Sequence, residues 1–112
     1  MEAAYQSAKK LIESGKNMTA VYTVSDNMAV GVIKALADSS IKVPKDMSLI
    51  SIDGLDFTRY LVPTLTTMAQ PIKEMGQECV NQLISRINGG PHCQKTLPAV
   101  LRPGGTVKKN KK

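Results

Sequence analysis

A strand, a helix and a second strand follow one another within about 33 residues, and this succession constrains the fold more than any other feature of the chain. Residues 20–24 and 47–52 are short, largely apolar runs that are typical of strands. Between them, residues 27–38 place apolar side chains at the spacing of one helical face: Ala29, Val32, Ile33 and Leu36. A connection of this length makes the two strands parallel, with a right-handed crossover. The pattern predicts an α/β fold in which residues 20–24 form a strand covered on both faces.

Two further helices and two further strands are predicted around this unit. Residues 2–14 carry an apolar face and end at a glycine, which tolerates the left-handed conformation of a helix end. Residues 71–88 carry a longer apolar stripe and begin with a proline, which suits the first turn of a helix. Residues 65–69 are a predicted third strand, and residues 96–101 a last extended segment whose proline favours an edge position. We therefore expect a parallel sheet with flanking helices.

The composition indicates one domain, over residues 1–107, and a short basic tail. A chain of 112 residues with 42% apolar residues is long enough for one modest core. The net charge is +6, but four lysines within residues 108–112 supply four of these charges and leave +2 for the remainder. A terminal lysine cluster is typical of a solvated, disordered end, so charge gives no reason to infer contact with DNA.

The sequence gives no support for catalysis, a cofactor or a metal site. Cys79 and Cys93 are the only cysteines, and their spacing fits neither a metal cluster nor a disulfide framework. His92 is the only histidine, so no Ser or Cys nucleophile has an evident base. No apolar run approaches the roughly 20 residues of a membrane span, and the N-terminus lacks a secretion signal. We expect a cytoplasmic protein without a membrane partner, unless the chain is a fragment whose true start lies upstream.

Asp53 is the first candidate binding residue. It ends an apolar strand and opens a polar loop of roughly a dozen residues, which is long for a compact domain. In open α/β sheets, ligands lie beyond the carboxyl ends of the strands, so a carboxylate at this point can bind a ligand. Because the two strands are parallel, Asp26 must lie at the same edge of the sheet. A carboxylate that only caps a turn is the alternative for Asp53, and Ser25 or Asp26 can equally serve as helix caps.

Four segments together resemble the LacI/GalR family, in that family's order and spacing: residues 25–31, 43–53, 60–67 and 70–76. The resemblance covers about residues 3–107 and corresponds to the C-terminal part of the family's effector-binding domain. It implies a bacterial transcription regulator with a fold like the type I periplasmic binding proteins, whose two α/β lobes hold a small molecule, usually a sugar or nucleobase. This chain would form one incomplete lobe, and the helix near 71–88 would belong to the other lobe.

The resemblance also implies roles for individual residues. Asp53 would accept hydrogen bonds from ligand hydroxyls, and Ser25 and Asp26 match positions at or beside the ligand. Gln70 lies at the crossover between lobes, where it can reach the cleft or remain a solvated amide. Gly54 departs from a second acid that is common in the family. Four residues match positions in or near the family's dimer contact, although exposed apolar residues are also ordinary on monomers: Val30, Lys34, Tyr60 and Leu61.

The expected function is therefore effector sensing, with a sugar as the expected effector and a homodimer as the expected assembly. The family's DNA-binding domain has no counterpart in these residues, so DNA would be contacted only through a domain absent from this chain. A solute-binding receptor of the same fold, for transport or chemotaxis, is an alternative that the missing secretion signal disfavours. A phospho-receiver domain also places an Asp at a strand end, but the acidic pair expected after its first strand is not visible.

Overall fold

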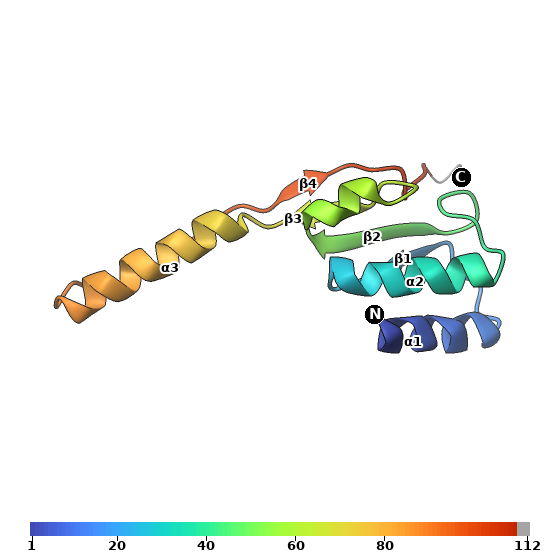
Figure 1. Ribbon diagram of the computed structural model, residues 1–112, viewed down its shortest axis with the longest axis horizontal. Coiled ribbons are helices and arrows are strands. Elements are labelled where there is room, and N and C mark those ends of the chain that lie inside the picture. Colours follow the sequence, from blue (N-terminus) through green and yellow to red (C-terminus); the bar gives the residue numbers. More distant parts are fainter. Residues whose placement is uncertain (110–112) are drawn as a thin grey trace.

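The computed structural model describes residues 1–109 of the chain. Helices and strands follow one another as shown in Figure 1, in the order α1 (Glu2–Glu13), β1 (Ala20–Tyr22), α2 (Asp26–Asp38), β2 (Ser48–Asp53), η1 (Asp56–Tyr60), β3 (Thr66–Ala69), α3 (Ile72–Ile87) and β4 (Val100–Arg102). The predicted helices and strands are confirmed to within a few residues at their ends. The structure adds η1, a short 3-10 helix inside the long loop that follows β2.

The four strands form one sheet in the order β1-β2-β3-β4. β1 runs parallel to β2, with Val21 opposite Leu49, and β2 runs parallel to β3. β4 is antiparallel to β3, because the chain returns from α3 before it enters the sheet (Figure 1). The parallel pairs confirm the predicted strand-helix-strand unit. They also bring the carboxyl ends of β1, β2 and β3 to one edge of the sheet.

α1 and α2 lie together on one side of the sheet, with α2 against β2 and α1 against α2 (Figure 1). The apolar spacing predicted for residues 27–38 supplies the buried face of α2. The core is a single cluster of small and aliphatic side chains: Ala4, Ala29, Val32, Leu36, Met47, Leu49 and Leu65. Burial of one aliphatic side chain of this kind stabilises the fold by about 1.5–3 kcal/mol, so this cluster holds the two helices on the sheet.

β1 is an edge strand, and one of its two faces is open: Ala20 and Tyr22 are exposed, whereas Val21 on the opposite face is half-buried. The prediction that residues 20–24 are covered on both faces is therefore wrong. Within residues 1–109 β1 pairs only with β2, and Tyr22 is 59% exposed. Thr19 and Thr23 direct their backbone groups toward β2, so the groups of Ala20 and Tyr22 point away from it. A short apolar run has the same composition in a central strand and at an edge, which is why the sequence did not distinguish them.

α3 projects away from the sheet (Figure 1), and none of its residues is buried. The predicted apolar stripe is present, but it is exposed within the part of the chain that the structure describes: Ile72, Met75, Val80, Leu83, Ile84 and Ile87. The Cα radius of gyration is 18.0 Å, whereas a compact chain of this size has about 13 Å. The helix therefore adds length to the molecule and no core.

The segment after β4 returns to the sheet and fastens it. The buried hydroxyl of Thr106 donates to the Leu49 carbonyl at 2.7 Å and accepts from the Thr66 N–H at 2.9 Å, which links β2 to β3. Lys108, the first residue of the basic tail, donates its N–H to Ser48 Oγ at 3.3 Å. Residues 110–112 of that tail lie outside the described residues.

Of the helices in residues 1–109, none combines the length and the apolar character that crossing a membrane requires.

We predict that truncation of a leucine in the sheet destabilises the chain far more than truncation of a leucine in α3. Leu49 is fully buried, so Leu49→Ala leaves a cavity and should lower the free energy of unfolding by about 2–5 kcal/mol. Leu83 is 60% exposed, so Leu83→Ala should change it by less than about 0.5 kcal/mol. Urea denaturation followed by circular dichroism measures both values. Equal losses would show that α3 is packed in solution.

Candidate ligand-binding site

Asp53 ends β2 with its half-buried carboxylate held by two neighbouring segments. Its Oδ2 accepts from the backbone N–H of Asp26 at 3.2 Å, and its Oδ1 accepts from Gln70 Nε2 at 3.0 Å. Asp53 has a backbone φ of +126°, a conformation that residues other than glycine rarely adopt and that occurs most often at functional sites. The expectation that Asp26 and Asp53 lie at the same edge of the sheet is confirmed, and Gln70 joins them there.

Asp26 is fully buried, and both oxygens of its carboxylate accept hydrogen bonds from the protein. Oδ2 accepts from the backbone N–H groups of Gly54 and Leu55, both at 2.8 Å. Oδ1 accepts from the hydroxyl of Thr67 at 2.7 Å. This one side chain connects the start of α2, the loop after β2 and the strand β3. With 0% of its surface exposed, Asp26 has no area with which to touch a ligand in this structure.

Ser25 is the N-cap of α2, where its Oγ accepts from the backbone N–H of Asn27 at 3.2 Å. Capping by Ser25 satisfies one of the N–H groups that the first turn of a helix leaves without a partner. The side chain is half-buried, at the same edge of the sheet as Asp53. The structure thus shows the capping role, and ligand contact by Ser25 stays a prediction.

The loop that leaves Asp53 is held close to the neighbouring strand. Gly54 has a φ of +80°, and a Cβ at this position would lie 2.4 Å from the Cβ of Ala69. The guanidinium of Arg102, in β4, donates through Nη2 to the Gly54 carbonyl at 2.8 Å. The second acid common in the family could not fit here without displacing β3. Glycine at this position therefore suits the close approach of two backbones.

Sequence reasoning did not identify Thr67 or Arg102 as part of this site. Thr67 is fully buried, and its only sequence signal is a pair of threonines in a strand that otherwise requires apolar residues. Arg102 lies opposite Thr67 in the β3–β4 register, a pairing that cannot be seen from a separation of 35 positions. Its Nη1 is buried and has no hydrogen-bond partner among residues 1–109. Arg102 contacts the loop after β2 directly, whereas Thr67 acts on it through the carboxylate of Asp26.

A hollow of 570 Å³ opens beside this edge of the sheet, between the loop after β2 and the first turn of α3. Its lining includes Gly54, Asp56, Gln70, Lys73 and Glu74. The mixture of acidic, basic and amide groups suits a polar ligand. Within residues 1–109, no group of three or more His, Cys, Asp or Glu side chains is placed to hold a metal ion.

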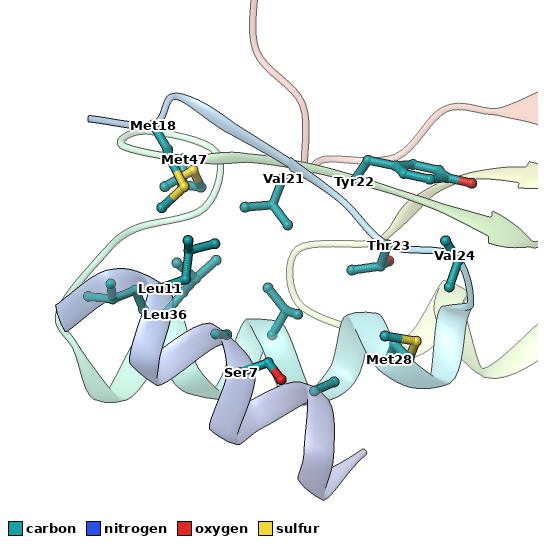
Figure 2. Close-up of a pocket in the computed structure, with 14 residues that line it drawn as sticks. Ser7, Leu11, Met18, Val21, Tyr22, Thr23, Val24, Met28, Leu36 and Met47 are labelled. Atoms are coloured by element: carbon teal, nitrogen blue, oxygen red, sulfur yellow. The ribbon is translucent and has the colours of Figure 1, made fainter. Parts of the chain in front are cut away.

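A different hollow, of 210 Å³, lies between α1, β1 and α2 (Figure 2). Leu11, Met18, Val21 and Leu36 are among the side chains that point into it. None of the acidic or basic side chains in residues 1–109 lines it. Thr23 also lines it, with a buried hydroxyl that finds no hydrogen-bond partner in the described part of the chain. This apolar hollow is a gap under the open edge of β1, and it contains none of the residues predicted to bind ligand.

The residues predicted at a dimer contact are found on α2 and at the end of η1. Val30 is half-buried, and Lys34 pairs with Asp38 on the same helix face. Hydrogen bonds from the Lys34 ammonium and then from the Tyr5 hydroxyl hold the pKa of Asp38 below its ordinary value. Tyr60 is 84% exposed, whereas Leu61 packs against the core cluster. Their participation in a dimer stays a prediction.

Comparisons with known proteins give a consistent result. The family profile of periplasmic binding protein-like domains matches residues 1–107. The transcriptional regulator MalR of Clostridium butyricum is 42% identical over 84 residues, which are 75% of this chain and 25% of MalR. A LacI family regulator from Enterococcus faecium, solved with bound ribose, superposes with a TM-score of 0.84 at 32% identity, over 96% of this chain and 40% of that one. The lac repressor dimer bound to operator and an anti-inducer superposes with a TM-score of 0.87 at 27% identity, over 93% and 37% of the two chains.

The sheet, its helices and the matched profile define one lobe of a periplasmic binding protein-like fold. The chain belongs to the LacI/GalR family of transcriptional regulators, as its four sequence segments indicated. These relatives are transcriptional regulators and not enzymes. They give no support to the two alternatives, a transport receptor and a phospho-receiver. The chain spans 25% of the length of MalR and 40% of the ribose-bound structure.

We predict that Asp26→Ala is strongly destabilising and that Asp26→Asn is much milder. Alanine leaves two backbone N–H groups and the Thr67 hydroxyl without a partner, and each buried unsatisfied group costs about 1–3 kcal/mol. The loss should reach at least about 3 kcal/mol. Asparagine keeps one oxygen for the two N–H groups and can donate to Thr67, so we expect a loss of about 1–2 kcal/mol. Urea denaturation measures both, and equal losses would contradict a hydrogen-bonding role.

Glycine replacement at two positions should have opposite effects. Gly54→Ala places a methyl group against Ala69 in a backbone conformation with positive φ, so we expect a loss of at least about 1 kcal/mol. Gly76→Ala, inside α3, meets no atom within 4 Å and should stabilise the helix by about 0.5–1 kcal/mol. Thermal unfolding of the two variants tests this contrast. A neutral Gly54→Ala would mean that the loop does not lie against β3.

Proposed function

We propose that this chain is the effector-sensing part of a transcriptional regulator, and that Asp53 accepts hydrogen bonds from hydroxyl groups of a sugar effector. The observation that carries the proposal is the half-buried carboxylate at the end of β2, oriented by Asp26 and Gln70. A carboxylate has about four acceptor sites, and these contacts use two, so about two remain for ligand donors. Charge-assisted bonds of this kind contribute about 1.5–3 kcal/mol each.

In this proposal, Gln70 and Ser25 contact the effector beside Asp53. Gln70 uses one N–H of its amide for Asp53, and its second N–H and its Oε1 can address a ligand. Ser25 accepts from Asn27 at the helix start, while its hydroxyl hydrogen can donate. Asp26, which sequence reasoning grouped with these contacts, would instead hold the loop and the carboxylate of Asp53 in place.

A sugar is the proposed effector because its neighbouring hydroxyls can donate to both oxygens of one carboxylate. The ribose-bound relative from Enterococcus faecium supports this class of ligand. The neighbouring hollow of 570 Å³, which Gln70 lines and Asp53 and Ser25 do not, falls within the range of about 300–1,000 Å³ that small-molecule sites occupy. Selection among sugars would follow from hydroxyl geometry, since a missing donor leaves a half-buried carboxylate with an unmet acceptor site.

The longer regulator would respond through the relative positions of its two lobes. An effector shifts that balance only by binding one arrangement better than the other, and a tenfold difference supplies about 1.4 kcal/mol. We further propose that the protein is cytoplasmic and dimeric, with Val30, Lys34, Tyr60 and Leu61 at or near the dimer contact. The lac repressor relative, solved as a dimer on its operator, supports this arrangement. DNA would be contacted through a domain outside these residues.

The ligand role of Asp53 can be tested by NMR on the isotope-labelled chain, titrated with ribose, lactose and a panel of other pentoses and hexoses. We expect at least one sugar to shift the amide signals of Asp53 and Gln70. Asp53→Ala should weaken that sugar's binding at least about tenfold, the loss expected for one charge-assisted bond. Glu13→Ala, an exposed acid on α1, is the matched control and should bind normally. Unchanged binding by Asp53→Ala, or no shift at this edge with any sugar, would overturn the proposal.

A further inference from the structure

After α3 the chain reverses and runs back beside the helix. The backbone N–H of Gly90 donates to the Ser85 carbonyl at 2.8 Å, and Arg86 donates to the Gly90 carbonyl at 3.1 Å, which closes the turn. Further along, the ammonium of Lys95 forms an ion pair with Glu78 at 2.8 Å. Gly90 contacts Ser85, and Lys95 contacts the earlier residue Glu78, so the two segments run in opposite directions. We call α3 and residues 90–97 the two arms of this hairpin.

Cys79 and Cys93 line the same hollow, one from each arm. α3 contributes one face at helical spacing to the hollow between the arms: Met75, Glu78, Cys79 and Gln82. The returning arm contributes the other side: His92, Cys93, Gln94, Lys95 and Leu97. Both thiols are exposed, so both can be reached by small reagents.

The ion pair between Lys95 and Glu78 places the two cysteines near the same level of the hairpin. Cys79 is one residue beyond Glu78, a rise of about 1.5 Å toward the turn. Cys93 is two residues nearer the turn than Lys95, at most about 6.6 Å in an extended chain. With Lys95 level with Glu78, the offset of the two cysteines along the axis is about 5 Å, and the distance across the hollow adds to it. A disulfide spans a Cα separation of about 4.4–6.8 Å, so the two arms must approach each other before the bond can form. The hollow of 650 Å³ between the arms must close for the sulfurs to meet.

We propose that Cys79 and Cys93 form a reversible redox pair, and that their oxidation by a small disulfide locks the returning arm onto α3. The thiolate of one cysteine attacks a sulfur of the small disulfide, which forms a mixed disulfide and releases one small thiol. The thiolate of the other cysteine then attacks the protein sulfur of that mixed disulfide and releases the second small thiol. The protein loses two hydrogen atoms in total, and the small disulfide is reduced to two thiols.

The lock would act on a hairpin that is weakly fastened when its thiols are reduced. α3 buries no residue, and an exposed ion pair between flexible side chains stabilises little. A disulfide restricts the open states of the loop that it closes, so it should suppress local opening of this hairpin. The pair touches neither Asp53 nor Gln70, so the inference does not depend on the proposed effector site.

The test is to treat the reduced full chain with glutathione disulfide and to follow the mass of the products by mass spectrometry. We expect a monomer lighter by two hydrogen atoms, a peptide cross-link between Cys79 and Cys93, and at least about tenfold slower amide exchange over residues 79–95. Cys79→Ser and Cys93→Ser should each stop at a glutathione adduct. A wild-type chain that also stops at the adduct, or that forms only intermolecular disulfides, would overturn the proposal.

A matched variant separates proximity from mere thiol reactivity. Cys79→Ser combined with Asn81→Cys moves the helical thiol to the face lined by Gly76, Gln77 and Val80. This variant should remain at the adduct, because its thiol faces away from the returning arm. Lys95→Ala should slow cross-linking of the wild-type pair about two- to fivefold, the effect of losing one exposed ion pair. Equally fast cross-linking from position 81 would mean that the arms have no fixed alignment.

Discussion

The hydrogen bonds of the buried Asp26 carboxylate hold together the edge of the sheet at which Asp53 lies. The carboxylate accepts from two consecutive N–H groups of the loop after β2 and from a hydroxyl on β3. A buried carboxylate is tolerable only when its oxygens are satisfied, so these three donors and the acid require one another. Removal of the acid would leave three polar groups exposed to an apolar interior. The start of α2, the loop and β3 are therefore fixed as one unit.

That unit explains how Asp53 maintains an uncommon backbone conformation. The Asp53 carboxylate accepts a hydrogen bond from the backbone N–H of Asp26, so the backbone of Asp26 fixes the side chain of Asp53. Arg102 fastens the next carbonyl, and Gly54 allows the loop to lie against Ala69. A rigid surrounding of this kind would keep the proposed binding group in place before a ligand arrives, which would reduce the entropy lost on binding.

The apolar surfaces of the molecule divide into a covered half and an uncovered half. α1, α2 and the sheet bury one cluster of aliphatic side chains, whereas α3 presents its stripe to solvent and β1 leaves its outer edge unpaired within residues 1–109. The hollow beneath that edge is lined mainly by apolar residues (Figure 2). The stripe of α3 and the hollow under β1 both have the apolar composition that is typical of buried surfaces. The chain covers less than half of the length of the solved structures that it resembles.

The sequence by itself determined the strand-helix-strand unit, the helices and the family, because these depend on local spacing and on motifs read in order. Residues 27–38 show their buried face through periodicity alone, and the handedness of the crossover follows from backbone geometry. Only the tertiary structure decided that Asp26 is a buried anchor, since its partner Thr67 lies 41 residues away. It also decided that β1 is an edge and that the stripe of α3 is uncovered. A side chain is buried only when distant parts of the chain pack against it. The local sequence pattern contains no information about those distant contacts.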